Sequence, residues 1–565
     1  MYQHNSDDSS FVLKNLISIA DLERSPAFAS AGFDLDSLLA INSEAGKLAS
    51  ADLANCNRDA DAQGTRFVDG EVLVPRSIVD AIRALGAGGW LGLRTAVNYG
   101  GQGLPELVNT LAMENWAAAN LSVTMHVILS IGSAMAIQSH GTEQQKHCYL
   151  PKLANGEWSG VMALTEPQAG SDLAGVATAA KPESDYYRIK GQKSFISWGE
   201  HQVSNNIIHL VLARLPNAPL GTKGISLFIV PKFLADEEGK YTIRNDIKCI
   251  AVEKKLGLHC SPTCVMSYGD NEGAVGYLIG EENRGLNCMF TMMNEARLKV
   301  GVQALGASEV AYQASLAYAN SRKQGKFLVV HPDVKRMLLI QKSLIDAMRT
   351  IAYTEAVRID CAEIKNSALE QARVNLMIPI VKAWFTEVAQ EICGMAVQIH
   401  GGLGYVEETG VAQYLRDIRV STIYEGTNGI QSEDLVMRKI VRDRGEAIDA
   451  LFAEIRDTVA DARSDNNCHA ERVAAAISTL QLRVRCLLAK TDNENIALAN
   501  SFDLMMSLGY LCGAWASLRM LNTCSRRREL GRRVDVAKFY IDRILPRIHG
   551  HVIDMSEPSW LGTEL

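Results

Sequence analysis

The chain has 565 residues, of which 47% are hydrophobic and 21% are charged, and its formal net charge at pH 7 is −7. This length predicts three or four domains, and the composition is ordinary for a globular protein in water. The acidic balance, with a pI of about 6.0, argues against nucleic acid as the main partner. The twelve cysteines have no C-x-x-C spacing, so we expect reduced, mostly buried thiols in a cytoplasmic protein and no metal site.

The first ten residues, MYQHNSDDSS, have neither the basic region nor the apolar region of a secretory signal. The longest apolar segment, VTMHVILSIGSAMAIQ, is short for a membrane span and contains a histidine and serines. We therefore expect a chain that does not span a membrane.

In chain order, residues 1 to about 160 show helical periodicity, clearest in 37–53 and 107–141. From about 161 to 280, runs rich in β-branched and aromatic residues alternate with turn residues, which predicts a small all-β barrel or sandwich. The runs that carry this prediction are YYRIKGQKSFIS, NIIHLVLARL, GISLFIV and AVGYLIG.

Helical periodicity returns after GEENRG and continues to about residue 440, with segments long enough for the helices of a bundle. More helices are predicted after that point. The expected fold is therefore α+β and multidomain, and the order of its parts predicts four domains. They are a helical N-terminal domain (1–160), a β-barrel middle domain (161–280), a helical bundle (281–440) and an additional C-terminal helical domain (441–565).

The segment GGLGYV (401–406) is similar to a dinucleotide-binding fingerprint. It follows a predicted helix rather than a strand, however, and no βαβ unit surrounds it. A nicotinamide-binding Rossmann site is therefore not expected, and a redox cofactor would have to be held by another arrangement.

Glu425 lies between Tyr424 and Gly426 in STIYEGTNGIQ, with no Lys or Arg beside it in the sequence. One interpretation is a helix start, because Thr427 and Asn428 are cap-type residues and an acid there suits the helix dipole. The other interpretation is a general base that faces a substrate. The residues of this segment are compatible with both.

The segment MALTEPQAGSD (162–172) offers two hydroxyls and a glycine at which main-chain N–H groups can meet a flavin or a phosphate, although an ordinary turn has the same residues. It resembles the signature loop of the acyl-CoA dehydrogenase flavoenzymes, TEPxAGSD. Five more segments resemble that family in the same order. They are GQKSFISWG (191–199), MMNEARL (292–298), SRKQGK (321–326), QIHGGLGY (398–405) and YEGT (424–427).

The resemblance covers the whole chain. GLHCSPTCVM, HPDVKRMLL and AKFYIDRILPR are similar to one branch, the 3-methylmercaptopropionyl-CoA dehydrogenase-like proteins, which carry an extra C-terminal helical domain. Phe195 and Ser197 stand where the wider family usually has Trp and Thr, and Cys260 stands where the branch generally has Gly. These departures weaken the prediction of substrate preference more than the prediction of the reaction.

The resemblance implies FAD-dependent dehydrogenation of an acyl-CoA thioester, such as 3-methylthiopropanoyl-CoA or a similar short acyl-CoA, to the trans-2-enoyl-CoA. Glu425 would abstract the α-proton, and flavin N5 would accept the β-hydride. The substrate contacts that the resemblance implies are Ser171, Asn294, Arg297 and Gly426. The implied FAD contacts are Met162, Leu164, Thr165, Gly170, Ser171, Phe195, Ile196, Ser197, Arg322, Gln324, Gln398, Gly401, Gly402 and Thr427.

The resemblance further implies an electron-transfer flavoprotein as the acceptor and a homo-oligomer, expected to be a dimer, in which Arg322 and Gln324 serve the FAD of another subunit. From the residues alone, SRKQGK also fits a solvated helix end, and Arg297 also fits a structural pair with Glu295 or Glu425. His400 is expected to be a helix-end residue rather than a catalyst.

Three alternatives stay open. An acyl-CoA oxidase would pass electrons to dioxygen, and a carrier-protein-linked enzyme would act on acyl groups held on a phosphopantetheine arm. A DNA-binding flavoprotein of the same fold is suggested by the basic run CSRRRELGRR (524–533). Its ordinary interpretation is a solvated helix face, with Glu529 and Asp535 pairing nearby.

Overall fold

The computed structural model describes residues 2–29, 32–462, 467–489, 494–527 and 531–551. The chain forms two compact units. The first unit contains 1–47, 110–118 and 297–565, and the second contains 48–109 and 119–296. Two helices, α7 (Glu106–Ala119) and α10 (Gly285–Ser321), have residues in both units.

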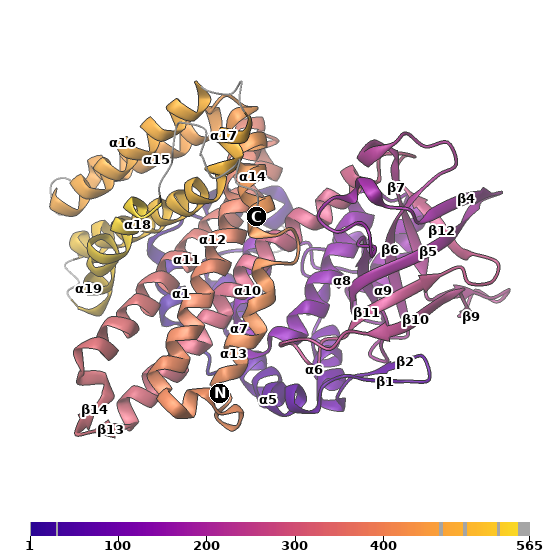
Figure 1. Ribbon diagram of the computed structural model, residues 1–565, viewed down its shortest axis with the longest axis horizontal. Coiled ribbons are helices and arrows are strands. Elements are labelled where there is room, and N and C mark those ends of the chain that lie inside the picture. The colour runs from indigo at the N-terminus through magenta and orange to yellow at the C-terminus, as the bar shows by residue number, and fades with distance from the viewer. Residues whose placement is uncertain (1, 30–31, 463–466, 490–493, 528–530, 552–565) are drawn as a thin grey trace, which may run out of the picture. The chain divides into compact units, whose positions relative to one another are not determined.

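The second unit combines strands with a few helices (Figure 1). Its helices are α5 (Ala54–Gln63), α6 (Arg76–Ala87), α8 (Leu121–His140) and α9 (Glu143–Ala154). Its strands are β1 (Arg66–Val68), β2 (Glu71–Leu73), β3 (Trp158–Ala163), β4 (Ala179–Glu183), β5 (Tyr186–Ser197), β6 (Asn206–Arg214), β7 (Ile225–Pro231), β8 (Phe233–Ala235), β9 (Tyr241–Arg244), β10 (Ile247–Val252), β11 (Thr263–Tyr268) and β12 (Ala274–Ile279).

The main sheet of this unit closes on itself. Its strand order is β10-β11-β5-β12-β7-β6-β3, and β4 pairs with both β5 and β6. The strands β5, β12, β7, β6 and β4 therefore form a ring, in which the bridge between Ala179 and Arg214 joins β4 to β6. This ring confirms the predicted β-barrel, to which β3 and the β10–β11 pair are attached, and β6 and β7 are buried along almost their whole length.

The first unit is helical, within the described residues, apart from a hairpin of two short strands. Its helices are α1 (Ser6–Asn15), α2 (Ala20–Arg24), α3 (Pro26–Ala29), α4 (Leu35–Leu48), α11 (Pro332–Lys365), α12 (Ala368–His400), α13 (Val411–Ile418), α14 (Asn428–Glu433), α15 (Glu446–Ala462), α16 (Asn467–Leu488), α17 (Glu494–Ala499), α18 (Ser501–Arg527) and α19 (Arg532–Phe539). The hairpin is β13 (Lys323–Gln324) with β14 (Lys326–Phe327).

The C-terminal helices pack directly on α12. Helix α18 runs beside α11 and α12 (Figure 1). A side chain at Gly509 of α18 would approach the Trp384 ring to 2.2 Å, so the two helices can meet at this point only with glycine there. The Arg547 guanidinium also forms a bidentate pair with Glu391 of α12, at 2.6 and 2.8 Å. This block therefore supports the helix that, as described below, holds Glu425.

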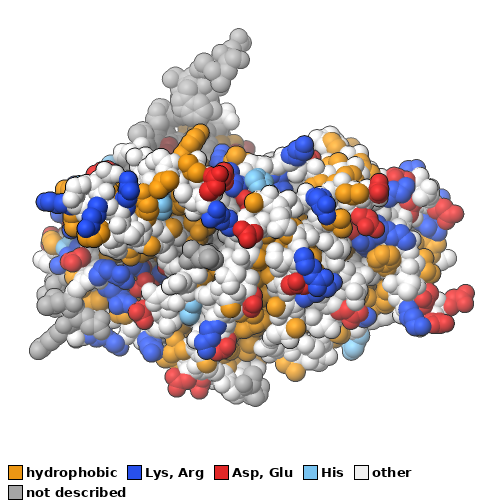
Figure 2. Space-filling model, turned by 90° about the horizontal axis from the view of Figure 1, so that it is seen from below, with side chains coloured by type: hydrophobic (Ala, Val, Ile, Leu, Met, Phe, Trp, Pro, Cys, Tyr) orange, Lys and Arg blue, Asp and Glu red, His pale blue; other side chains and the backbone are white. Residues whose placement is uncertain are grey.

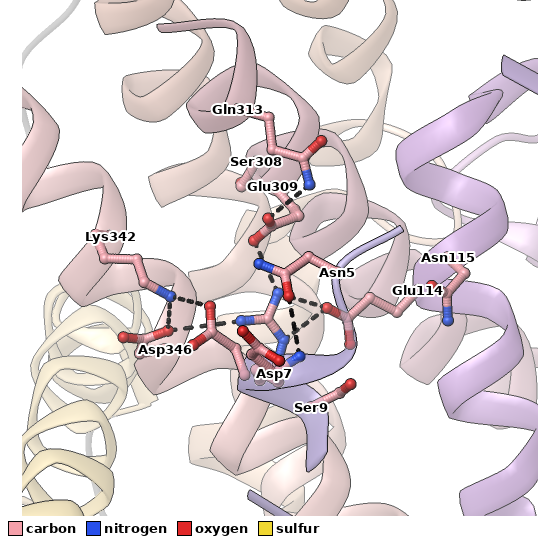
Figure 3. A network of polar contacts seen from close by, with 12 residues as sticks. Asn5, Asp7, Ser9, Glu114, Asn115, Ser308, Glu309, Gln313, Lys342 and Asp346 are labelled. Carbon is pink, nitrogen blue, oxygen red and sulfur yellow. Dashed lines mark hydrogen bonds and ion pairs between the residues drawn. The ribbon is translucent and has the colours of Figure 1, made fainter. Parts of the chain in front are cut away.

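A buried charge network joins α1 to α11 (Figure 3). Lys342 donates to Asp346 at 2.5 Å and to Asp8 of α1 at 2.6 Å. Arg349 donates to Glu114 at 2.7 Å and to Glu309 at 2.8 Å. Charges are stable at such depth only when they are paired and hydrogen-bonded, so this network fixes how the N-terminal helix docks on the bundle.

The basic run near the C-terminus is partly neutralised, by partners other than the expected ones. Arg526 pairs with Asp461 at 3.2 Å, and Arg533 pairs with Asp8 at 3.3 Å. Asp535 makes no ion pair within the described residues, so the predicted pairing with it is wrong, and Glu529 lies outside them. Figure 2 shows acidic side chains interspersed among the Lys and Arg side chains on the face that it displays.

Three local features differ from the sequence-based expectation. A hairpin, β1–β2, interrupts the segment predicted as helical, and β3 begins at Trp158, slightly before the predicted boundary. The helical segment 107–141 is two helices rather than one. It breaks at Asn120, whose side chain accepts a hydrogen bond from the Val123 N–H and so caps α8.

Two helices have the length and apolar composition of a membrane span, α8 and α18, although the first was judged too short from the sequence. In both, most of the apolar window is buried inside the protein, 89% in α8 and 94% in α18. Both are therefore packed as core helices, which makes them weak evidence for a span. All twelve cysteines are free and nine of them are buried, as expected.

Candidate active site

Glu425 lies in a tight turn with left-handed backbone at two successive residues. Glu425 and Gly426 have φ values of +57° and +85°, in the left-handed region that is unfavourable for most side chains. A Cβ atom at Gly426 would lie 2.6 Å from Nε2 of Gln431, so a side chain there would displace the amide that holds the Glu425 carbonyl. A non-glycine residue held at positive φ is a strained position of the kind that clusters at functional sites.

Donors from two helices hold the carbonyl oxygen of Glu425. Gln431 of α14 donates from Nε2 at 3.2 Å, and Arg297 of α10 donates from Nε at 3.4 Å. The preceding residue is fixed as well, because the Tyr424 hydroxyl donates to Gln303 at 2.6 Å. The predicted pairing of Arg297 with Glu425 is therefore present as a contact to the main chain.

A third helix holds the next carbonyl. Lys382 of α12 donates from Nζ to the Gly426 carbonyl at 2.7 Å and to Oδ1 of Asn428 at 2.8 Å. The Asn428 amide in turn donates to Thr386 at 2.9 Å and to Glu387 at 2.8 Å, both on α12. The turn is thus tied to α10, α12 and α14 together.

The helix-start interpretation of this segment is confirmed. Thr427 is the N-cap of α14, and its hydroxyl accepts a hydrogen bond from the Ile430 N–H at 3.2 Å. The main-chain N–H of Glu425, by contrast, has no acceptor within the described residues. It is therefore available to an external acceptor, and it lies in the same segment as the helix cap.

The environment of the Glu425 carboxyl favours a base. Its Oε2 atom is shielded from solvent and has no hydrogen-bond partner among the residues that the structure describes. Burial raises the pKa of Glu425, and the charges of Arg297 and Lys382 oppose part of that rise. A desolvated carboxylate is suited to accept a proton when no hydrogen bond lowers its basicity.

In the second unit, the loop over 164–178 is organised around Glu166. This buried carboxylate accepts hydrogen bonds from the main-chain N–H groups of Ala177 and Thr178, at 2.8 and 3.0 Å, and from Lys193 at 2.8 Å. Lys193 also donates to the Leu164 carbonyl at 2.9 Å. The Lys193 charge and these donors hold the pKa of Glu166 at about 2 despite its burial. The loop that carries Thr165, Gly170 and Ser171 is therefore pinned to β5.

At the end of β5 a bulge exposes an aromatic ring. The pairing of β5 with β11 shifts between Lys193 and Ile196, and Phe195 adopts a φ of +58° with 64% of its surface exposed. Bulges of this kind re-aim side chains next to binding sites. Ser197, two residues on, is half-buried, and Ile196 is buried. An exposed ring next to the loop that carries Thr165, Gly170 and Ser171 is compatible with one face of a flavin.

The remaining predicted cofactor residues lie at the surface of the first unit. Arg322 and Gln324 follow the end of α10 and are exposed, and the Arg322 guanidinium makes no ion pair within the described part of the chain. Gln398, Gly401 and Gly402 are exposed at the end of α12. His400 is the last residue of α12 and stacks on Tyr318, as expected for a helix-end residue. A free guanidinium suits a pyrophosphate.

Comparison with known proteins decides the family. Four family models match in order: "Acyl-CoA dehydrogenase, N-terminal domain" over 38–157, the "middle domain" over 161–270, the "C-terminal domain" over 283–440, and "Acetyl-CoA dehydrogenase C-terminal like" over 451–559. The 3-methylmercaptopropionyl-CoA dehydrogenase of Ruegeria pomeroyi is 39% identical, over 91% of this chain and 90% of its own. The chain belongs to the acyl-CoA dehydrogenase family.

Further relatives agree with this assignment. A butyryl-CoA dehydrogenase of Syntrophomonas wolfei is 31% identical over 94% of each chain. The structure of Caenorhabditis elegans ACDH-11 in complex with C11-CoA has the same fold, with a TM-score of 0.77 and 20% identity, and covers 97% of this chain and 92% of its own. Acyl-CoA dehydrogenases are FAD-dependent oxidoreductases that act on a CH–CH bond of an acyl-CoA, and this chain is such an enzyme.

Sequence reasoning missed the residues that support the site. Lys382 is a single lysine inside an apolar helical segment, and Gln431 lies in the helix after the base, so neither stands out as a motif. Glu166 and Lys193 are part of the quoted segments, but their mutual contact was not foreseen. Asn294 and Arg297 do lie on one helix three residues apart, as predicted, and their contact with CoA stays a prediction.

Proposed function

We propose that this enzyme dehydrogenates a short acyl-CoA, such as 3-methylthiopropanoyl-CoA, to the trans-2-enoyl-CoA. The observation that carries the proposal is the Glu425 carboxylate, whose Oε2 atom is shielded from solvent, has no hydrogen-bond partner among the described residues and belongs to a strained turn. The relative from Ruegeria pomeroyi, which is 39% identical, supports the choice of substrate.

In the proposed reaction, Glu425 accepts the α-proton as the C–H bond breaks, and its free main-chain N–H donates to the thioester oxygen, where negative charge develops. Because the pKa of Glu425 is raised, it lies closer to the pKa of the substrate's α C–H group. The chemistry that FAD supplies when bound is acceptance of the hydride from the β-carbon, which completes the double bond. Gly426 lets the thioester approach the main chain closely, and Asn294, Arg297 and Ser171 bind the CoA part.

We further propose that Met162, Leu164, Thr165, Gly170, Phe195, Ile196, Ser197 and Thr427 hold FAD within one subunit. Arg322, Gln324, Gln398, Gly401 and Gly402 would serve the FAD of a second subunit in a homodimer. The exposed Phe195 ring and the unpaired Arg322 guanidinium support this division. An electron-transfer flavoprotein is the proposed acceptor, and the cytoplasm the proposed location.

The function is tested with a panel of acyl-CoA esters of increasing chain length, under anaerobic conditions, by the loss of flavin absorbance. We expect short esters to bleach the flavin fastest. Turnover with oxygen alone, as fast as with an artificial dye, would instead indicate an oxidase. Activity only on carrier-loaded acyl groups would indicate a carrier-linked enzyme, and an unbleached flavin with every ester would contradict the proposal.

Arg322→Ala is expected to weaken FAD binding by about 10- to 100-fold, which corresponds to the loss of a hydrogen bond to a charged group. The measurement is a titration of the apoprotein with FAD, followed by flavin fluorescence. Arg336→Ala removes another exposed arginine, whose partner is Asp333 in its own helix, and should leave the affinity within about twofold. An unchanged affinity in Arg322→Ala would rule out the pyrophosphate contact.

A further inference from the structure

Lys382 is a fully buried lysine without a direct ion pair. Its surface is 0% exposed, and it forms no salt bridge within the described residues. Its ammonium group donates instead to two neutral oxygens, the Gly426 carbonyl at 2.7 Å and Oδ1 of Asn428 at 2.8 Å. A buried charge with only neutral hydrogen-bond partners is costly, so its position calls for a functional explanation.

Three residues of α12 hold the turn through Asn428. Lys382 and Thr386 are four residues apart and lie on one face of the helix, and Glu387 also reaches the Asn428 amide. Thr386 and Glu387 accept hydrogen bonds from the Asn428 amide, whose oxygen accepts from Lys382. The carbonyl of Gly426 therefore cannot move without breaking a connected set of hydrogen bonds, and the strained φ of Glu425 is fixed by it.

Charge is the second contribution of Lys382. The charged groups that face it are Glu425 from the turn, Arg297 from α10 and Glu387 from its own helix. Arg297 in turn faces Asp434 and Arg438. Burial lowers the pKa of Lys382 to about 7, while Glu425 favours its charged form. The charges of Arg297 and Lys382 both lower the pKa of the Glu425 carboxyl, against the effect of its burial.

We propose that Lys382 is a positioning residue for Glu425: it fixes the turn through the Gly426 carbonyl and supplies buried positive charge that keeps the Glu425 carboxyl ionised. This inference rests on the proposed function, in which Glu425 is the base. Lys382 does not touch the substrate in this account and acts only through Glu425 and the turn.

The test compares Lys382→Gln, which keeps an N–H donor but removes the charge, with Lys382→Arg, which keeps the charge. The readout is the titration of the Glu425 carboxyl in the apoprotein, from infrared difference spectra in which the Glu425→Gln protein identifies the signal. Because an adjacent cation lowers the pKa of a carboxyl, we expect the titration to move up by about one pH unit in Lys382→Gln and to be restored in Lys382→Arg.

The acid limb of the pH dependence of kcat/KM should move in the same direction. Dehydrogenation requires the Glu425 carboxylate, so the rate falls as the pH falls through its pKa, and a raised pKa moves that fall to higher pH. Lys299→Gln is the matched control. Lys299 is also buried in this unit, but it is not among the charges that act on Glu425, and its loss should leave both profiles unchanged.

A Glu425 titration in Lys382→Gln that coincides with the wild type would overturn the inference. So would a shift of equal size in Lys299→Gln. The titration needs neither FAD nor turnover. If no acyl-CoA bleaches the wild-type flavin, the proposed function fails, and the carboxyl titration still shows whether Lys382 acts on Glu425.

Discussion

Replacing Glu425 by glutamine is expected to leave a folded, yellow protein that dehydrogenates acyl-CoA about 10⁴-fold more slowly, the upper range for the loss of a general base. The amide has nearly the same shape as the carboxyl and cannot accept the α-proton. The hydrogen bonds that hold the turn come from Arg297, Gln431 and Lys382 to main-chain oxygens. They do not involve the replaced carboxyl, so substrate binding should persist.

The control for this variant is Glu433→Gln. Glu433 is an exposed acid on α14, in the same segment as the base, and its replacement should leave kcat within about twofold. The measurement is turnover with a dye acceptor, together with the Kd of the acyl-CoA from the flavin spectrum. Retained activity in Glu425→Gln would show that another group removes the proton.

Lys193→Met is expected to open the β-barrel around the 164–178 loop. The substitution leaves Glu166 buried without its cation, and breaking a buried pair in this way lowers stability by about 3–5 kcal/mol. It also frees the Leu164 carbonyl. Amide hydrogen exchange of peptides from β3 and β5 should become about 100-fold faster or more. The affinity for FAD should fall with it, because the loop that carries Thr165 and Ser171 loses its anchor.

Lys240→Met is the matched control for that variant. Lys240 pairs with Glu238 in an exposed turn of the same unit, where both side chains are at least 70% accessible. Exposed pairs contribute little to stability, so exchange in β3 and β5 should match the wild type. Wild-type exchange in Lys193→Met would mean that the Glu166 pair does not hold the loop.

Much of the fold could be predicted because its elements are long and strongly patterned. The runs that became β5, β6, β7 and β12 alternate or are apolar throughout, and α10 and α12 extend over thirty residues or more. The β1–β2 hairpin was missed because each of its strands has only three residues. The break between α7 and α8 was missed because it depends on a hydrogen bond that the Asn120 side chain accepts from the Val123 N–H, rather than on glycine or proline.

Only those site residues that lie together in one segment of the sequence could be predicted. YEGT marks Glu425 and the glycine that its turn requires. The lysine that holds this turn is more than forty residues away in sequence, and the connection exists only because α12 packs against the turn. In the same way, the acids that pair with Arg533 and Arg526 lie in α1 and α15, so neighbours in the sequence suggested the wrong partners.

The removal of the α-proton by Glu425 can be measured most directly in a single turnover. The FAD-loaded protein is mixed anaerobically with 3-methylthiopropanoyl-CoA, and flavin absorbance and the enoyl-CoA product are followed together. We predict that the wild type bleaches in step with formation of one equivalent of trans-2-enoyl-CoA, and that Glu425→Gln stays yellow. Bleaching of Glu425→Gln at the wild-type rate would contradict the role of this carboxylate.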